Sequence, residues 1–209
     1  MHLLPRPQRN NKLGIKPKPQ QSFEQPELEF IEQPTVSSDH TVSSDHQERI
    51  AIFIDGSNLC HAATHLNIEI NYTKLLRCLT KKRKLLRAYF YTAIDNTNKK
   101  QQGFLLWMRR NGYRVVTKEL MQHPDGSQKA NLEVELAVDM LTLARYCHTL
   151  VLLSGEEELA YALDAVSYQG VQVEVVSLGL MTSDSLLSVA DSYTDLAEIK
   201  HDIQKECIT

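Results

Sequence analysis

The sequence predicts an α/β domain with three layers, in which a central parallel sheet of about five strands has helices on both faces. From residue 49 onward, short apolar runs alternate with segments of helical pattern. The apolar runs are nearly continuous, which is typical of strands that are buried on both faces. Right-handed crossovers between such strands then limit the topology to the doubly wound type.

The first half of this pattern covers residues 49–117. The first strand is expected at 49–54 (RIAIFI), and Asp55-Gly56-Ser57-Asn58 follows it as turn chemistry. Helical segments are expected at 58–66 and 73–80, before an aromatic-rich strand at 85–93. A helix at 98–111 ends at Gly112, and a third strand is expected at 113–117.

The second half begins with a loop tip at 123–127 (HPDGS) and continues with the longest helical pattern, at 132–146. A fourth strand, TLVLL, is expected at 149–153, and a helix at 156–168 stops before Gly170. The fifth strand is expected at 171–176 (VQVEVV). Two closing helices are expected at 183–189 and 196–203.

The N-terminal segment differs in composition from the rest of the chain. Six of the seven prolines lie in the first 34 residues, and TVSSDH occurs twice in tandem at 35–46. A segment with so few aliphatic residues cannot offset the entropy of ordering, so residues 1–48 are expected to be disordered. The expected domain covers 49–203, and 204–209 forms the C-terminal end.

Charge and composition exclude several classes of protein. The net charge of −3 gives no strong field toward nucleic acid or anionic membrane, and no run approaches the ~20 apolar residues of a membrane span. The N-terminus lacks the apolar core of a secretory signal. The four cysteines have no CxxC spacing, so a zinc site or disulfide framework is not expected. We therefore expect a cytoplasmic protein without membrane contact, and a homo-oligomer remains open.

Acidic residues follow the predicted strands. Asp55 ends the first strand, and Ser154-Gly155-Glu156-Glu157-Glu158 follows the fourth. If these two strands are neighbours, Asp55 and Glu156 leave the sheet at the same edge, where ligands of such folds bind. Gathered carboxylates favour a hard cation such as Mg²⁺ or Mn²⁺. The structural alternative is that these acids form turns and stabilise helix starts.

Four segments together resemble a known family. They are IFIDGSNL (52–59), KANLEVELAVDM (129–140), LVLLSGEEEL (150–159) and QGVQVEVV (169–176). They are similar to the NYN domain, and more closely to its LabA-like (DUF88) branch of the PIN-like ribonuclease superfamily. The resemblance implies a PIN-like fold with an acidic, metal-dependent ribonuclease site.

The resemblance also implies roles for individual residues. Asp55, Glu133 and Glu156 are the implied catalytic residues, and Asp139 joins them as an implied ligand of Mg²⁺ or Mn²⁺. The implied supporting residues are Asn58, Asp139, Ser154, Glu158 and Lys129. Glu133, Glu156 and Glu158 stand where the family has aspartates, whereas Glu157 and Ala130 stand where it has glycines. Each such glutamate keeps the charge but adds one methylene.

Two functions from different classes stay open. The first is a metal-dependent ribonuclease, an endoribonuclease acting on RNA phosphodiesters, with catalysis weakened by the glutamates. The second is a regulator of gene expression with little or no catalysis, which binds RNA or a protein partner and uses its N-terminal tail as a tether. The basic run 81–84 offers phosphate contacts or a solvated surface. A nucleotide-binding domain is disfavoured because neither GxGxxG nor GxxxxGK[ST] is present.

Overall fold

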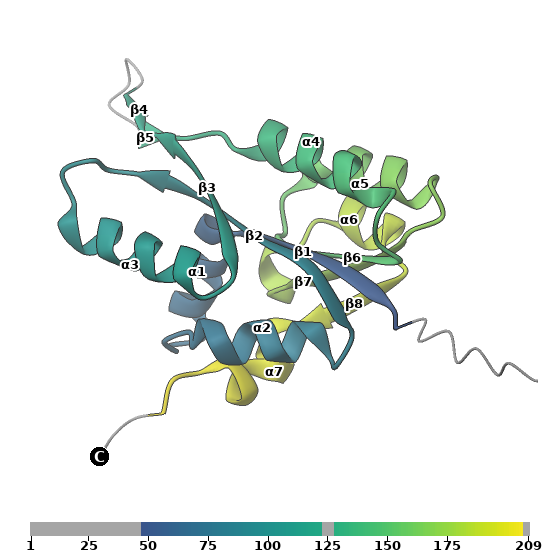
Figure 1. Cartoon of the computed structure of the whole chain (residues 1–209), viewed down its shortest axis with the longest axis horizontal. Helices are drawn as coiled ribbons and strands as arrows, with labels where there is room; N and C mark the ends of the chain where they lie inside the picture. The colour runs from purple at the N-terminus through teal and green to yellow at the C-terminus, as the bar shows by residue number, and fades with distance from the viewer. Residues whose placement is uncertain (1–46, 123–127, 207–209) are drawn as a thin grey trace, which may run out of the picture. The chain divides into compact units, whose positions relative to one another are not determined.

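The computed structural model describes residues 47–122 and 128–206, so the expectations for residues 1–46 and for the loop tip 123–127 lie outside the described residues. The main sheet has six strands in the order β3-β2-β1-β6-β7-β8, and every neighbouring pair is parallel (Figure 1). The strands are β1 (Arg49–Asp55), β2 (Lys84–Ile94), β3 (Tyr113–Glu119), β6 (Thr149–Leu153), β7 (Gln172–Ser177) and β8 (Ser192–Asp195). A separate antiparallel pair is formed by β4 (Met121–Gln122) and β5 (Gln128–Lys129).

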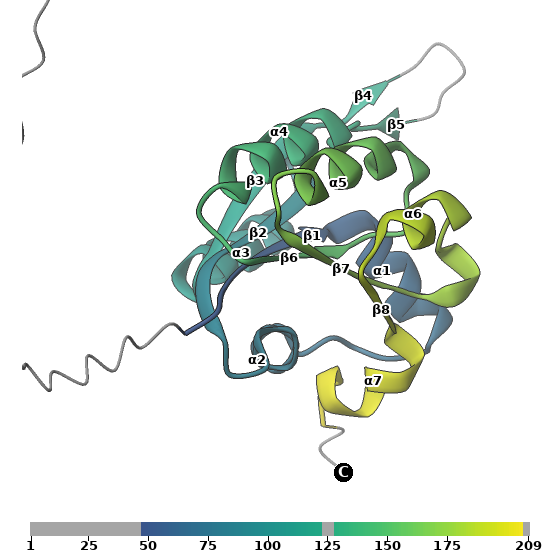
Figure 2. The same ribbon diagram turned by 90° about the vertical axis from the view of Figure 1, so that its right-hand side faces the viewer.

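Helices cover both faces of the sheet, which confirms the predicted three-layer α/β/α fold (Figure 2). One face carries α1 (Gly56–His65), α2 (Tyr72–Thr80), α3 (Lys99–Arg110) and α7 (Leu196–Ile203). The other face carries α4 (Glu133–Ala144), α5 (Ala160–Ser167) and α6 (Asp184–Val189). Two 3₁₀ turns, η1 (Glu157–Leu159) and η2 (Gly179–Met181), follow β6 and β7.

The central strand β1 separates two apolar clusters. Ile50, Ile52 and Ile54 pack against the helices of the α1 face, while Ala51 and Phe53 pack on the α4 face. All five side chains are fully buried, as the continuous apolar run predicts. Because side chains alternate along a strand, Asp55 follows Phe53 on the α4 face.

The structure differs from the sequence prediction at three places. The sixth strand β8 (SYTD) is polar and lies at the sheet edge, and its partner β7 supplies the pairing that its own sequence does not signal. Helix α1 begins at Gly56, earlier than expected, because Asp55 caps it. The helix expected at 156–168 is divided into η1 and α5.

An ion-pair cluster joins distant segments at the amino ends of the strands. The Arg83 guanidinium donates to both oxygens of Glu174 on β7, at 2.7 and 3.0 Å, and also contacts Glu48 at 3.3 Å. The hydrogen bonds to Glu174 raise the pKa of Arg83, and the Thr149 hydroxyl lowers the pKa of Glu48. The Arg83 side chain is 12% exposed, so water screens this cluster weakly. It fastens the α2–β2 turn to β7.

We expect Arg83→Met to lower the free energy of unfolding by about 2–3 kcal/mol, because it leaves Glu174 charged and half-buried without its partner. The double variant Arg83→Met/Glu174→Met is expected to cost less, since it removes both charges. Urea denaturation of the natural protein, of the single variants Arg83→Met and Glu174→Met, and of the double variant measures both effects. Strict additivity of the two single substitutions would show that the pair does not act as a unit.

Candidate functional site

The pairing of β1 with β6 brings two predicted site residues together. Ile54 and Leu153 are partners in the parallel register, so Asp55 and Ser154 are the next residues at the carboxyl edge. The Ser154 hydroxyl is fully buried and donates to Oδ2 of Asp55 at 3.3 Å. The condition on which the sequence argument depended, that the first and fourth predicted strands are neighbours, is therefore met.

Asp55 also caps helix α1. Its Oδ1 accepts hydrogen bonds from the backbone N–H groups of Ser57 and Asn58, at 2.9 and 3.1 Å, and from the Ser57 hydroxyl at 2.7 Å. These three donors fix the carboxylate and occupy one of its oxygens. Oδ2 accepts only the longer bond from Ser154 among the described residues, and it is the oxygen with free capacity.

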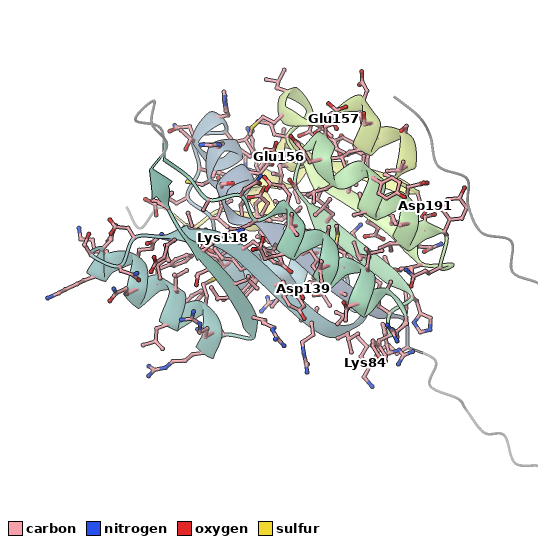
Figure 3. All side chains as sticks on the ribbon, turned by 90° about the horizontal axis from the view of Figure 1, so that it is seen from above. Lys84, Lys118, Asp139, Glu156, Glu157 and Asp191 are labelled. Carbon is pink, nitrogen blue, oxygen red and sulfur yellow. The ribbon has the colours of Figure 1, made fainter. Side chains whose placement is uncertain are left out.

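Asn58 connects Asp55 to the segment after β6. Its side chain is 2% exposed, and Nδ2 donates to Oε1 of Glu156 at 3.3 Å. The backbone N–H of Glu156 in turn donates to the Ser154 hydroxyl oxygen at 3.3 Å. Asp55, Asn58, Ser154 and Glu156 thus form one set of contacts, which we call the Asp55 network. Figure 3 shows Glu156 at this end of the sheet, beside Glu157.

Two glycines allow the backbone to approach closely around the Asp55 network. A Cβ atom at Gly56 would lie 2.7 Å from both the Phe90 ring and the Tyr91 carbonyl oxygen. A Cβ atom at Gly155 would overlap the carbonyl of Met181. Any larger residue at these positions would push the start of α1 or the segment after β6 away from the site.

Unsatisfied polar atoms gather at the same edge of the sheet. Among the described residues, the buried side-chain oxygens without a hydrogen-bond partner are Asn58 Oδ1, Glu135 Oε2 and Ser177 Oγ. They lie at the start of α1, in the first turn of α4 and at the end of β7. Buried polar atoms normally have partners, so each of these oxygens retains the capacity to bind water, an ion or a polar ligand.

Asp139 is held by Tyr91, a residue to which the sequence analysis gives no role at the site. Tyr91 on β2 is the register partner of Asp55, and its hydroxyl donates to Oδ2 of Asp139 on α4 at 2.8 Å. Burial, followed by the hydrogen bond to Asp139, raises the pKa of Tyr91 well above its usual value. The hydroxyl therefore stays protonated and remains a donor. The sequence does not reveal this contact, because it depends on the register of β1 and β2 and on how α4 packs against these strands.

The other predicted residues lie around this centre. Glu133 begins α4, where the Asn131 amide lies against its carboxylate. Glu157 and Glu158 are exposed in η1, and Glu157 accepts a bond from Ser185 at 3.2 Å. Lys129 ends β5, but its side chain is outside what the structure describes.

The first turn of α4 is tied to the edge strand β3. Lys118 donates to Glu135 at 2.7 Å and to the Asn131 carbonyl at 2.8 Å. The hydrogen bond from Lys118 lowers the pKa of Glu135. In Figure 3, Lys118 and Asp139 both lie beside α4. This ion pair links the first turn of α4, which includes Glu133, to β3.

The four implied metal ligands are only partly brought together. Asp55 and Glu156 share the Asp55 network, whereas Asp139 bonds to Tyr91 and Glu133 stands at the helix start. Within 47–122 and 128–206, no group of three or more His, Cys, Asp or Glu side chains is placed to hold a metal ion. The expected basic run is also divided, because Arg83 pairs with Glu174 while Lys84 is exposed.

Comparison with known proteins identifies the family to which this chain belongs. Residues 49–197 match the NYN domain family. The protein named "Low amplitude and bright protein LabA" from Synechococcus elongatus is 30% identical over 165 residues, which cover 75% of this chain and 88% of that protein. A crystal structure of a protein of unknown function from Vibrio parahaemolyticus has a TM-score of 0.68 and 25% identity, and the match covers 78% of this chain and 99% of the other. The resemblance in the four sequence segments is thereby confirmed, and the chain belongs to the NYN domain family.

Proposed function

We propose that this chain is a divalent-metal-dependent ribonuclease domain that acts on RNA phosphodiesters. The observation that carries the proposal is the Asp55 network, in which carboxylates from β1 and from the segment after β6 share contacts through Asn58 and Ser154. Membership of the NYN family supports an RNA-related, PIN-like domain. No helix in the described part of the chain is long and apolar enough to cross a bilayer.

The donor set fits a hard divalent ion. Carboxylate, amide and hydroxyl oxygens are the ligands that Mg²⁺ and Mn²⁺ prefer, and Asn58 Oδ1 is buried without a partner. We assign Asp55 and Glu156 as the ligands supplied by the sheet edge, with Glu133 and Asp139 contributing from α4. A bound ion would lower the pKa of water and offset the charge of the scissile phosphate.

The remaining residues hold and orient the reacting groups. Asp55 presents Oδ2 because its Oδ1 is saturated by the α1 cap. We assign to Asn58 and Ser154, which contact the two carboxylates, the holding of a water molecule or a phosphate oxygen beside them. We assign a supporting role to Glu158 and a phosphate contact to Lys129, which lies on the approach to α4.

One observation favours the second function, a NYN-fold regulator of gene expression with little catalysis. The four acids do not form one group of metal-ligating side chains among the described residues. The additional methylene in Glu133 and Glu156 matters because productive site geometry is held to about 0.5 Å. Such a regulator would bind RNA or a protein partner, with residues 1–48 as a tether.

Asp55→Asn is expected to abolish cleavage of a labelled single-stranded RNA, with a loss of at least about 100-fold, because it removes a ligand charge while keeping a side chain that can cap α1. Gel analysis with Mg²⁺ and with Mn²⁺ measures the loss. Asp164→Asn on α5 is the matched control and is expected to retain activity. Equal activity of Asp55→Asn and the natural protein would remove this site from consideration.

Glu156→Gln is expected to weaken binding of Mn²⁺ by about tenfold or more, because the neutral amide is a poor ligand for a hard cation. Isothermal titration calorimetry of the full chain measures this without any need for turnover. Glu198→Gln on α7 serves as the control. If the natural protein gives no heat with Mn²⁺ yet binds RNA, the regulator is the better description.

Tyr91→Phe is expected to weaken Mn²⁺ binding by about tenfold, because hydrogen bonds that orient ligand carboxylates contribute that much to metal affinity. The same calorimetric titration checks it. Tyr89→Phe is the matched control, since Tyr89 stacks on Tyr91 and its hydroxyl has no hydrogen bond within the described residues. A smaller effect of Tyr91→Phe than of Tyr89→Phe would contradict the positioning role of Tyr91.

A further inference from the structure

Several exposed cations share the α4 face of the sheet. Arg49 and Lys84 are register partners at the amino ends of β1 and β2, and Arg87 is the partner of Ala51. Arg114 on β3 is the partner of Tyr89, and its guanidinium lies 5.5 Å from the centre of the Tyr89 ring. Ala51 and Tyr89 belong to the cluster on the α4 face, so Arg87 and Arg114 are on that face too.

The end of α4 adds one more cation to this surface. The backbone N–H of His148 donates to the Arg49 carbonyl at 2.8 Å, which brings the segment after α4 to the start of β1. Arg145 is exposed in that segment. We call this set the basic strip; it consists of Arg49, Lys84, Arg87, Arg114 and Arg145. None of these side chains forms an ion pair with another described residue.

The basic strip leads along the strands toward the Asp55 network. Arg114 is level with Tyr89, which lies one two-residue step from Tyr91, the register partner of Asp55. Arg87 is one further step away, and each step is about 7 Å. Figure 3 shows the same order, with Asp139 between Glu156 at the acidic edge and Lys84. The cations therefore extend from the site toward the opposite end of the sheet.

We propose that the basic strip binds the phosphate backbone of single-stranded RNA and directs the strand to the Asp55 network. This inference rests on the proposed function and adds the path of its substrate. Arginine guanidinium groups bind phosphate oxygens in pairs, and exposed unpaired cations release counterions when they meet a phosphate. The strip is suited to a polyanion because its charges continue over several residues along the sheet.

The aromatic residues below the strip are buried, and this limits how RNA can bind there. Tyr89 and Tyr91 are 4% and 1% exposed, and Arg114 covers the Tyr89 ring. Stacking of bases on aromatic rings requires open ring faces, which these side chains do not offer. Around Arg87 and Arg114 the basic strip therefore binds through phosphates, and binding there is independent of base sequence.

The test compares two charge-matched double variants of the full chain. Arg87→Gln/Arg114→Gln neutralises two of the five cations of the basic strip while keeping a long side chain at position 114, over Tyr89. Arg77→Gln/Arg109→Gln removes the same charge from α2 and α3 on the opposite face. Fluorescence anisotropy with a short, mixed-sequence, single-stranded RNA in EDTA measures binding without cleavage. Thermal unfolding establishes that each variant is folded, and Arg49→Gln/Lys84→Gln, which neutralises two other cations of the basic strip, replaces the first variant if it is not.

The strip variant is expected to bind about 25-fold more weakly at about 0.1 M salt, since each lost phosphate contact costs about fivefold there. The slope of log K against log salt is expected to become shallower by about 1.4. The control variant is expected to retain the affinity and slope of the natural protein, and an RNA of changed sequence to bind equally. For the replacement variant, the same loss of affinity and the same change of slope are expected.

Three results would overturn the inference. They are equal losses in the two double variants, an unchanged salt slope in the strip variant, and a loss of binding to an acidic peptide such as polyglutamate without a loss for RNA. Failure of the proposed function is separate, because it appears as absence of cleavage by the natural protein. RNA binding that depends on the strip in a protein that does not cleave would support the inference and reject the nuclease.

Discussion

The parallel pairing of β1 with β6 is the constraint on which the rest of the structure depends. Its register makes Asp55 and Ser154 neighbours although 99 positions separate them in the chain. Residues 50–54 of β1 and the whole of β6 are buried between helices, so a slip of one residue would turn Phe53 and Leu152 away from their cluster. The energy that maintains the core therefore also maintains the contact between the two segments of the site.

The carboxyl edge of the sheet around the Asp55 network combines rigid support with polar atoms that lack partners among the described residues. Asp55 is fixed by the cap of α1, and Gly56 and Gly155 allow the backbone segments to come close. Asn58 Oδ1 and Ser177 Oγ are nevertheless buried without hydrogen bonds. Such atoms reduce stability, since each loses its hydration without full compensation. Their concentration at one edge is understandable when that edge binds a polar ligand.

The small net charge conceals a division of charge along the sheet. The chain carries −3 overall, yet carboxylates surround the carboxyl ends of β1 and β6, while cations that form no ion pair with another described residue occupy the amino half of the α4 face. Opposite charges at the two ends would orient a polyanion, with repulsion at the acids relieved by a cation. Arg83 does not take part, because Glu174 and Glu48 already hold it.

The sequence alone determined the alternation of strands and helices, the buried character of 49–54 and 149–153, and the placement of acids after strands. These features follow from local periodicity and turn chemistry, which neighbouring residues encode. Tertiary structure decided the polar edge strand β8, the bond between Tyr91 and Asp139, and the side of the sheet on which each cation lies. Those contacts depend on register and on the rotation of α4 against the sheet, and both arise only when distant segments pack together.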